Sequence, residues 1–381
     1  MGLVGTKSPY IGNLSFLRYL SLSDNQFNGE IPQEVSHLYR LQTFRVTSNS
    51  LTGEIPRNLS SCKNLEDFSL SRNDLVGGIP TELGSLSELQ TLRLSRNHIG
   101  GTIPVSLSNL SVLTVFNLRS NNLYGTIPPQ IFNISSINST LPGTTLPNLE
   151  YLALGYNRFS GALPDSISNL SRLFRLDLAY NQFTGYVPPN LGNFKNLTVL
   201  NIEGNYLGRG DVDDLSFLNS LPNCRKLSNL ISLDLSDNQL SGIIPANICN
   251  STQLERISFS RNRLQGGIPP NFGNCNKMIV LGLAQNQLTG PIPKELIGLS
   301  SLTDALDLSG NQLTGELPSE VGSLIKIMEL NLSNNRLSGI IPGTLGRCIG
   351  LEALPLDGNL LGHSSIFQKS GGTPKVRYVR Q

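Results

Sequence analysis

The residues that could carry catalysis or hold a metal are few, and their spacing suits neither task. The histidines His37, His98 and His363 fall at unrelated positions of the chain's repeated pattern, so they form neither a paired-histidine metal motif nor a catalytic triad. The segment Gly5-Thr6-Lys7-Ser8 resembles the end of a phosphate-binding loop but lacks the glycine five residues earlier. The kinase signatures G-x-G-x-x-G, H-R-D and D-F-G do not occur. We therefore predict that the chain is not an enzyme and uses no metal or cofactor.

One loop has a composition that suggests binding. It contains Arg209-Gly210-Asp211-Val212-Asp213-Asp214. An Arg-Gly-Asp tripeptide can bind integrins, but three residues are a weak signal and the composition of a loop explains them. The aspartates lack the spacing and the final glutamate of a calcium loop. We interpret this segment as a loop without a metal.

Four of the five cysteines take the place of a leucine in a repeated L-x-x-L-x-x-L segment. They are Cys62, Cys224, Cys275 and Cys348. We interpret them as small apolar core residues, which is how free cysteine usually packs. Cys249 lies one residue out of this phase, and its pairing with Cys275, one repeat further on, is the alternative.

Asparagines in N-x-S/T sequences could carry glycans. Five share one repeat phase on the predicted back of the molecule, so they indicate either simple copying of an Asn-Leu-Ser unit or a glycosylated back face of a secreted protein. We predict glycosylation at Asn13, Asn58, Asn109, Asn133, Asn138, Asn169, Asn196 and Asn250. Asn331 has the same motif but lies on the opposite, inner face, where a glycan would obstruct the sheet.

The charge balance excludes some partners. The net charge is +2, and no dense run of lysine and arginine interrupts the repeats, so we predict no nucleic-acid partner. Residues 363–381 form an irregular basic tail with Lys369, Lys375, Arg377 and Arg380. No stretch of 18 apolar residues occurs and Met1 to Leu20 lack a leader pattern, so neither a spanning helix nor a targeting signal is visible.

The elements that must position these residues come from a repeat. The string L-x-x-L-x-L-x-x-N-x-L places an asparagine at 25, 49, 73, 97, 121, 157, 181, 205, 238, 262, 286, 311, 335 and 359. Most successive spacings are 24 residues, and the spacing is longer between Asn121 and Asn157 and between Asn205 and Asn238. Such a period predicts a solenoid whose units are stable only when stacked.

Each unit has a strand half and a return half. Leu92 and Leu94 alternate with Thr91, Arg93 and Ser95, which indicates a strand with one buried face. A Gly-x-Ile-Pro segment then turns the chain, because glycine accepts φ values closed to other residues and proline presets φ. The return half has leucines three residues apart, as short 3₁₀ turns require. We expect the repeated asparagine to satisfy backbone groups at the buried corner.

The two long spacings predict interruptions of this solenoid. We expect residues 1–362 to form about fourteen units, interrupted near 138–148 and 206–226. Residues 138–145 lack an L-x-L strand and its asparagine, so we predict a missing rung or a looped-out segment there, and a weak point in the stack.

The outward strand positions are free to vary, so recognition can reside there. Early repeats carry a basic stripe and middle repeats a mixed aromatic and charged patch, and tyrosine and arginine are the best anchors for a partner. The predicted ligand-binding residues are Arg45, Arg72, Arg93, Arg96, Arg119, Tyr151, Tyr156, Arg175, Asp177, Tyr180 and Glu203.

The complete string, L-x-x-L-x-L-S-x-N-x-L-x-G-x-I-P-x-x-L-G-x-L-x-x-L, resembles the extracellular repeats of plant leucine-rich-repeat receptor kinases over residues 3 to about 362. The segments from Ile11 to Arg18 and from Leu330 to Gly339 look like the subgroup of immune receptors. The resemblance implies an α/β solenoid, a leucine-rich-repeat superhelix or horseshoe with a parallel sheet on the concave face and short 3₁₀ or irregular turns on the convex face.

The resemblance also implies a function. It implies binding of a peptide or protein ligand in signalling or defence, a co-receptor kinase as partner, glycosylation, and the extracellular side of the plasma membrane or secretion. The family's signal peptide, caps, membrane helix and kinase domain have no counterpart in this sequence. Exposed end repeats therefore predict poor solubility, which a monodisperse, cooperatively unfolding sample would refute. Two alternatives are a secreted inhibitor of a pathogen cell-wall-degrading enzyme and a truncated product without binding.

Overall fold

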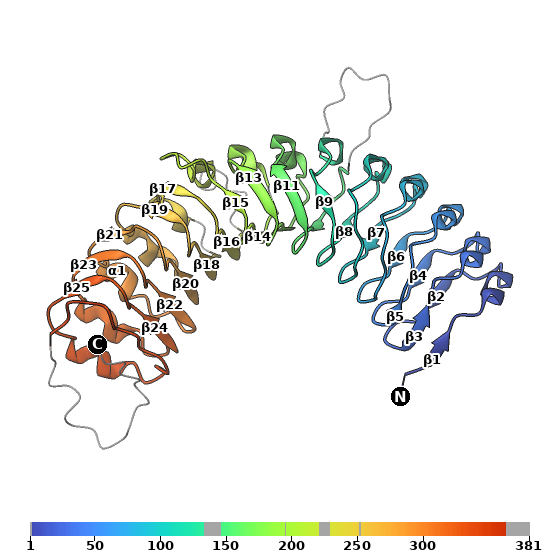
Figure 1. The fold of residues 1–381 in the computed structure, drawn as a ribbon. Helices are drawn as coiled ribbons and strands as arrows, with labels where there is room; N and C mark the ends of the chain where they lie inside the picture. Colours follow the sequence, from blue (N-terminus) through green and yellow to red (C-terminus); the bar gives the residue numbers. More distant parts are fainter. Residues whose placement is uncertain (1, 133–145, 195, 221–228, 251–252, 363–381) are drawn as a thin grey trace. The chain divides into compact units, whose positions relative to one another are not determined.

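The computed structural model describes residues 2–132, 146–194, 196–220, 229–250 and 253–362 (Figure 1). The chain divides into two compact units. The first comprises Met1–Thr184 and Asn193–Leu197, and the second comprises Gly185–Gly192 and Thr198–Gln381. Both are built from the same coil, in which a strand, a short lateral strand and a 3₁₀ helix follow one another.

In the first unit the L-x-L segments pair as parallel strands in sequence order. Their register advances by one repeat at each step, so that Leu92 lies between Phe68 and Phe116. The strands are β2 (Tyr19–Ser21), β4 (Thr43–Arg45), β6 (Asp67–Ser69), β7 (Thr91–Arg93), β8 (Val115–Asn117), β10 (Tyr151–Ala153) and β12 (Arg175–Asp177).

The second unit repeats this arrangement. Leu281 of its sheet lies between Ile257 and Leu306. The strands are β14 (Val199–Asn201), β16 (Ser232–Asp234), β18 (Arg256–Ser258), β20 (Val280–Gly282), β22 (Ala305–Asp307) and β24 (Glu329–Asn331).

Shorter lateral strands follow the ladder asparagines. In the first unit they are β1 (Val4–Thr6), β3 (Gln26–Gly29), β5 (Ser50–Leu51), β9 (Tyr124–Gly125), β11 (Arg158–Ala162) and β13 (Gln182–Gly185). In the second unit they are β15 (Tyr206–Leu207), β17 (Ser241–Ile243), β19 (Arg263–Gln265), β21 (Thr289–Gly290), β23 (Gln312–Glu316) and β25 (Arg336–Ser338).

The return halves are short 3₁₀ helices, and most of them begin after the proline of Gly-x-Ile-Pro. At Pro80 and Pro104 φ is −61° and −62°, the value that the ring imposes. These helices are η1 (Pro9–Asn13), η2 (Gln33–His37), η3 (Arg57–Ser61), η4 (Thr81–Ser85), η5 (Val105–Asn109), η6 (Pro129–Ile131), η7 (Asp165–Asn169), η8 (Pro189–Asn193), η9 (Ser216–Ser220), η10 (Ile248–Asn250), η11 (Pro270–Asn274), η12 (Ser319–Ser323) and η13 (Gly343–Arg347). One repeat has a single α-helical turn instead, α1 (Lys294–Ile297).

The core consists of the inward side chains between sheet and helices. Leu92, Leu94 and Leu83 are fully buried, and the rings of Phe44 and Phe68 stack with centroids 5.9 Å apart. Because each repeat adds one layer of such side chains, burial accumulates along the chain rather than in one centre.

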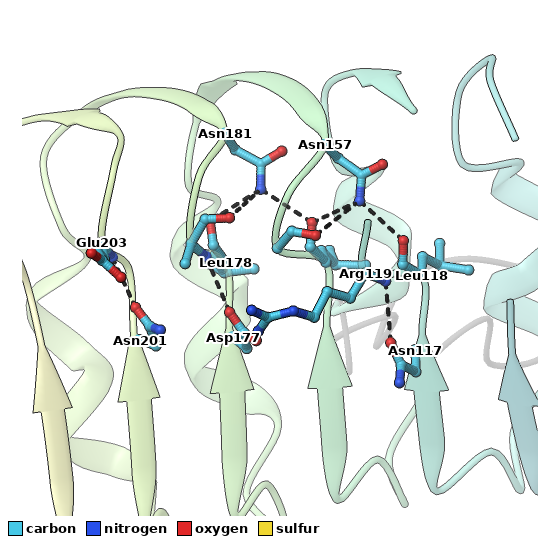
Figure 2. A network of polar contacts seen from close by, with 12 residues as sticks. Asn117, Leu118, Arg119, Asn157, Asp177, Leu178, Asn181, Asn201 and Glu203 are labelled. Carbon is cyan, nitrogen blue, oxygen red and sulfur yellow. Dashed lines mark hydrogen bonds and ion pairs between the residues drawn. The ribbon is translucent and has the colours of Figure 1, made fainter. Parts of the chain in front are cut away.

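The repeated asparagines form a ladder that joins each repeat to the one before it. The amide nitrogen of Asn97 donates to the carbonyl of Leu94 at 3.0 Å and to that of Leu70 in the preceding repeat at 3.1 Å. Its amide oxygen accepts the N–H of Leu75 at 3.1 Å. Figure 2 shows the same contacts at Asn157 and Asn181. The predicted role of this asparagine is confirmed.

The two long spacings leave the sheet uninterrupted. Strand β8 pairs directly with β10 and β14 with β16. Asn157 still donates to Leu118 at 3.0 Å although 39 residues separate them, and Asn238 donates to Ile202 at 2.9 Å across 36 residues. Of the two alternatives that we predicted, the pairing excludes a missing rung and leaves a looped-out segment, because pairing depends on the flanking strands and not on the residues between them. Most of segment 138–148 lies outside the described residues.

The observed architecture confirms the predicted class. Parallel strands form a sheet in each unit, and short 3₁₀ turns return the chain. The tail at 363–381 lies outside the described residues.

Candidate functional site

The residues predicted to bind a ligand lie on the sheet face that points away from the leucine core. They occupy three positions of the repeat. Arg45, Arg93, Tyr151, Arg175 and Asp177 are in strands, Arg119 and Glu203 come two residues after one, and Arg72, Arg96, Tyr156 and Tyr180 directly precede a ladder asparagine. All except Glu203 belong to the first unit.

The basic stripe contains an acid that joins two of its arginines. Asp67 Oδ2 accepts from Arg45 Nη2 at 2.5 Å and lies 3.9 Å from Arg93 Nη1. The hydrogen bond that Arg45 donates to Asp67 raises the pKa of the Arg45 guanidinium. The carboxylate therefore orients Arg45 through hydrogen bonds and reduces the positive charge that the two arginines present to a ligand.

Arg72 and Arg96 differ from these arginines. Both are exposed, and neither forms an ion pair with another described residue. Their guanidinium groups keep all of their donors for a carboxylate or phosphate, which arginine can bind through two parallel hydrogen bonds.

Arg119 crosses one repeat to reach Asp177. Its Nη1 is hydrogen-bonded to Asp177 Oδ2, and the side chain of Asp177 is only 1% exposed. Figure 2 shows the arginine side chain extended toward this carboxylate. Between them lies Gly155, where an added Cβ would be 2.8 Å from Asp177 Oδ1 and 3.1 Å from the carbonyl oxygen of Ala179. A glycine is required there because a side chain would displace the carboxylate.

Two tyrosines stand beside this ion pair. The rings of Tyr156 and Tyr180 have centroids 4.5 Å apart, and the Arg119 guanidinium lies 4.6 Å from the centre of the Tyr156 ring. The tyrosines are 44% and 38% exposed. We name Arg119, Tyr156, Asp177 and Tyr180 the clamped cluster, since buried and ring contacts fix the orientation of its partly exposed side chains.

A second aromatic group lies on the first strand positions. The guanidinium of Arg175 is 5.7 Å from the centre of the Tyr151 ring, and the Tyr151 and Phe174 rings are 6.1 Å apart. The Nε atom of Arg175 is buried without a hydrogen-bond partner. The structure therefore places two further predicted residues, Tyr151 and Arg175, in contact with each other.

The backbone at the position before each ladder asparagine has a positive φ, which sequence reasoning missed. φ is between 52° and 68° at Asp24, Ser48, Arg72, Arg96, Ser120, Tyr156, Tyr180, Gly204, Asp237, Arg261, Gln285, Gly310, Asn334 and Gly358. Bulky residues rarely adopt this left-handed conformation. The recurrence of glycine, asparagine and aspartate at this phase was the available signal.

The second unit has a hollow that the sequence did not indicate. Its volume is about 410 Å³, and it lies over β16 to β24 on the same type of sheet face. Of the predicted ligand-binding residues it includes only Glu203. The backbone N–H of Glu203 donates to Asn201 Oδ1 at 3.0 Å.

The Arg-Gly-Asp segment belongs to a loop organised by Asp214. This buried carboxylate accepts the backbone N–H groups of Arg209 and Gly210 at 3.0 Å and 3.1 Å, and the N–H of Ser241 at 3.0 Å. The Arg209 guanidinium lies 4.6 Å from the centre of the Tyr186 ring. These contacts give the segment a structural role.

The cysteines divide into a disulfide and buried thiols. Cys249 and Cys275 are bonded, so our interpretation of Cys275 as an unpaired core residue is wrong. Stacking of adjacent repeats brings the two Cα atoms to 5.1 Å, within disulfide range. Cys62 and Cys348 are free and buried as predicted; burial raises the pKa of both thiols, to about 11 at Cys62. Cys224 lies outside the described residues.

The predicted glycan acceptors differ in their exposure. Asn13, Asn109 and Asn196 are exposed. Asn58 and Asn169 are half-buried, and their amide nitrogens donate to the carbonyls of Gln33 and Phe132. Asn133, Asn138 and the side chain of Asn250 lie outside the described residues. A glycan is therefore best accommodated at the three exposed positions.

The described part of the chain contains no group of side chains that could form a metal site. No set of three histidine, cysteine, aspartate or glutamate side chains there is arranged to hold a metal ion. His98 Nε2 lies 3.7 Å from Asp74 Oδ1 at an exposed site, and His363 lies outside the described residues. Among the described residues, no helix has the length and apolar character needed to cross a bilayer.

Comparison with family profiles identifies the repeat. A profile described as Leucine Rich Repeat matches residues 16–38, 40–62, 64–86, 88–110, 112–134, 229–251, 253–275, 304–324 and 326–348. A second leucine-rich-repeat profile matches 133–183 and 147–207. Together the matches cover more than half of the 381 residues.

Two plant receptors are similar to the chain. The chain is 62% identical over 40 residues, 10% of its length, to the LRR receptor-like serine/threonine-protein kinase EFR of Arabidopsis thaliana, of which the match covers 4%. It resembles the plant peptide hormone receptor RGFR1, solved with RGF2, at 34% identity and a TM-score of 0.83, over 94% of this chain and 54% of that one.

A further receptor has been solved in two complexes. The ectodomain of the Arabidopsis receptor kinase HAESA with an IDA peptide hormone matches at 35% identity and a TM-score of 0.84, over 94% of this chain and 57% of that one. HAESA with IDA and the co-receptor SERK1 matches at 26% identity and a TM-score of 0.70, over 94% and 65%. The chain thus spans under two thirds of each relative, and the resemblance to plant receptor ectodomains is confirmed.

Proposed function

We propose, on the premise that this chain belongs to the leucine-rich repeat family, that it is part of the ligand-binding ectodomain of a plant receptor-like kinase and recognises a peptide. The observation that carries the proposal is the clamped cluster. The fold of the repeat requires leucine in the core and asparagine at the corner. It does not require Arg119, Tyr156 and Tyr180 on the outer face. Oriented arginine and tyrosine side chains are the usual anchors of a partner.

The neighbouring arginines define the chemistry of the ligand. Arg72, Arg96, Ser120, Tyr156 and Tyr180 occupy the same position in five successive repeats, and adjacent strands of a sheet are about 4.8 Å apart. A carboxylate bound by the two unpaired arginines would therefore lie a few residues of extended peptide from an apolar group on the tyrosines. We expect a ligand with an acidic segment and an aromatic or aliphatic residue.

The same proposal extends to partners and location. The structural neighbours include a peptide hormone receptor with its peptide and a receptor with peptide and the co-receptor SERK1. By analogy, this chain acts by binding rather than catalysis, engages a co-receptor kinase, and works on the extracellular side of the plasma membrane. The exposed glycan acceptors and the disulfide support an oxidising, extracellular location.

A displayed random-peptide library tests the proposal. The folded chain, produced with its disulfide, is used to enrich peptides, and affinities of single peptides are then measured by calorimetry. We expect acidic sequences with an aromatic or aliphatic residue. Arg96→Ala and Tyr180→Ala should each weaken binding by about 1 to 2 kcal/mol, or roughly five- to thirtyfold.

Arg57→Ala in η3 is the matched control because Arg57 is exposed but belongs to the opposite side of the repeat. Its affinity should equal that of the unaltered chain. Failure to enrich any sequence, or enriched peptides that bind equally well to the Tyr180→Ala chain, would reject the clamped cluster as the ligand site.

A further inference from the structure

The hollow of the second unit exists because its outer face carries small residues. Gly282 of β20 and Ala284 occupy the positions that Asn117 and Arg119 hold in the first unit. Even a methyl group at Gly282 would lie 3.0 Å from the hydroxyl of Ser260 and 3.3 Å from that of Ser258. The floor is therefore formed by hydroxyl groups and a single methyl group, and it stays open where larger side chains would fill it.

The walls of the hollow are predominantly acidic. Glu203, Asp237 and Asp307 contribute carboxylates, and Arg261 is the only basic residue among the described side chains that line it. Arg261 Nη1 is 3.9 Å from Asp237 Oδ2, and both side chains are more than half exposed. A pair of this kind contributes little and exchanges partners readily, so the arginine does not neutralise the site.

The polar groups of the floor are held in place. The Ser236 and Ser258 hydroxyls are 2.5 Å apart, and Ser260 Oγ accepts the N–H of Ala284 at 3.1 Å. Asp307 Oδ1 accepts the N–H of Ser309 at 3.0 Å. Because one carboxylate has more lone pairs than this single bond uses, Asp307 can still accept from a ligand.

The lining excludes several kinds of ligand. None of the described residues that line the hollow is aromatic, so these residues offer no stacking surface of the kind that holds a sugar or a base. Its apolar contribution is limited to Ala284, which gives an apolar group little to contact. A ligand with several N–H donors and a positive charge matches both the hydroxyl acceptors and the carboxylates.

We propose that this hollow binds a lysine or arginine side chain of the peptide ligand. This inference rests on the proposed peptide-receptor function and adds a cationic segment to the acidic segment expected at Arg72 and Arg96. A pocket of about 410 Å³ is within the range that binds small ligands. It holds an extended basic side chain with part of the adjoining backbone.

Blocked synthetic peptides test the charge preference directly. The full chain is titrated at low salt with acetylated and amidated Gly-Arg-Gly-Arg-Gly, with the corresponding glutamate peptide, and with spermidine as a cation that has no peptide backbone. We expect the arginine peptide to bind and the glutamate peptide not to bind. Added salt should weaken the binding, as it does for exposed charges.

Variants locate the binding site. Asp237→Asn combined with Asp307→Asn should weaken the arginine peptide about tenfold, since each exposed charge contact contributes roughly 0.7 kcal/mol. Asparagine at 307 still accepts the Ser309 N–H, so the fold is preserved. Ala284→Leu should fill the hollow and abolish binding. Glu320→Gln in η12 removes an exposed carboxylate elsewhere in the second unit and should change nothing.

Three results would overturn the proposal: equal binding of both peptides, unchanged binding by the double variant, or spermidine binding as tightly as the peptide. The last would identify a polyamine site. These failures are separate from failure of the proposed function, because peptides enriched on the chain could still depend on Tyr180 and Arg96 without containing a basic residue.

Discussion

At Arg96, Tyr156 and Tyr180 the backbone has φ values of 56°, 57° and 52°, and these residues are among those proposed to meet a ligand. Side chains of this size pay a steric cost of about 1 to 2 kcal/mol in the left-handed region. At the same position Gly204, Gly310 and Gly358 avoid it. Strain at a surface of this kind is common where recognition sets the residue type.

Replacing Arg96 isolates the strain, because its side chain is exposed and has no ion pair with a described residue. Arg96→Asn should raise the free energy of unfolding by about 0.5 to 1 kcal/mol, since asparagine tolerates this backbone and already occupies the position at Asn334. Denaturant unfolding measures the difference.

Arg96→Ala serves as the comparison. Alanine removes the same guanidinium but tolerates the left-handed region no better than arginine, so its stability should stay close to that of the unaltered chain. Equal stabilisation by alanine and asparagine would show that charge, and not backbone conformation, is responsible.

A carboxylate of the second unit should give stability a pH dependence. Burial raises the pKa of Asp234 above its ordinary value of 3.8, against the effect of its hydrogen bond with Ser236. Folding therefore favours the protonated form. The contribution of protonated Asp234 to the free energy of unfolding is fully present below pH 3.8. It is lost as the pH rises from 3.8 through the pKa of Asp234 in the folded state.

Asp234→Asn should consequently be more stable than the unaltered chain at pH 7, and the difference should disappear near pH 3. Asparagine at the equivalent positions 201 and 331 accepts the N–H two residues later, just as Asp234 does. Melting temperatures measured from pH 3 to 7 provide the test, and a difference independent of pH would contradict it.

The residue types predicted which side chains lie on the outer face of the sheet. They did not predict which of these side chains contact one another. The identity of Arg119 and Tyr156 as outward residues followed from alternation along the strand. The Arg119 contact with Asp177 joins residues 58 positions apart and requires the absence of a side chain at Gly155, and no local pattern specifies such a contact.

At the scale of the repeat, the asparagine ladder is the principal polar stabilisation. Asn97→Ala would leave the N–H of Leu75 without its partner. The carbonyls of Leu70 and Leu94 would lose one donor each and keep a hydrogen bond from the neighbouring ladder asparagine, Asn73 or Asn121. The cost should be about 1 to 3 kcal/mol, since one buried group left unsatisfied costs about that amount. Hydrogen exchange of the amides near residues 70, 75 and 97 would report the loss locally.

Asn122→Ala is a suitable control for this change. The Asn122 amide is exposed and donates only to the carbonyl of His98, at 3.4 Å. We expect a change within about 0.5 kcal/mol. A similar loss in both variants would mean that the ladder contacts contribute no more than surface hydrogen bonds.

The elements were predictable because each has a local cause. Alternating leucines specify the strands, and proline followed by leucines three residues apart specifies the 3₁₀ helices. The ladder continues across both long spacings, so of the two interruptions that we predicted there, the missing rung is excluded and the looped-out segment is not. A reading in sequence order treats inserted residues as a gap, whereas strand pairing depends only on proximity in space.

At the scale of the whole molecule, the Cys249–Cys275 bond closes a loop with a sequence separation of 26, about one repeat. A loop of this length constrains the unfolded chain by about 3.5 kcal/mol in the chain-entropy description. Replacing both cysteines by alanine should lower the stability of the second unit by about this amount, which differential scanning calorimetry can measure.

Reduction gives an independent version of this test. Dithiothreitol should lower the melting temperature of the unaltered chain and leave the double alanine variant unchanged. The buried thiols at Cys62 and Cys348 are already reduced, so they do not contribute to the difference. If dithiothreitol lowered the melting temperature of both chains equally, its effect would not come from the Cys249–Cys275 bond.

The ladder also determines how such a chain can change its length. Asn97 contacts residues 22 and 27 positions earlier, and where the offsets grow to 34 and 39 at Asn157 the hydrogen bonds keep lengths of 3.1 Å and 3.0 Å. A duplication or loss of one 24-residue segment during unequal recombination therefore restores the same contacts at the new junction. Genes of this type can therefore change the recognition surface by gaining or losing whole repeats, and the core needs no compensating mutation.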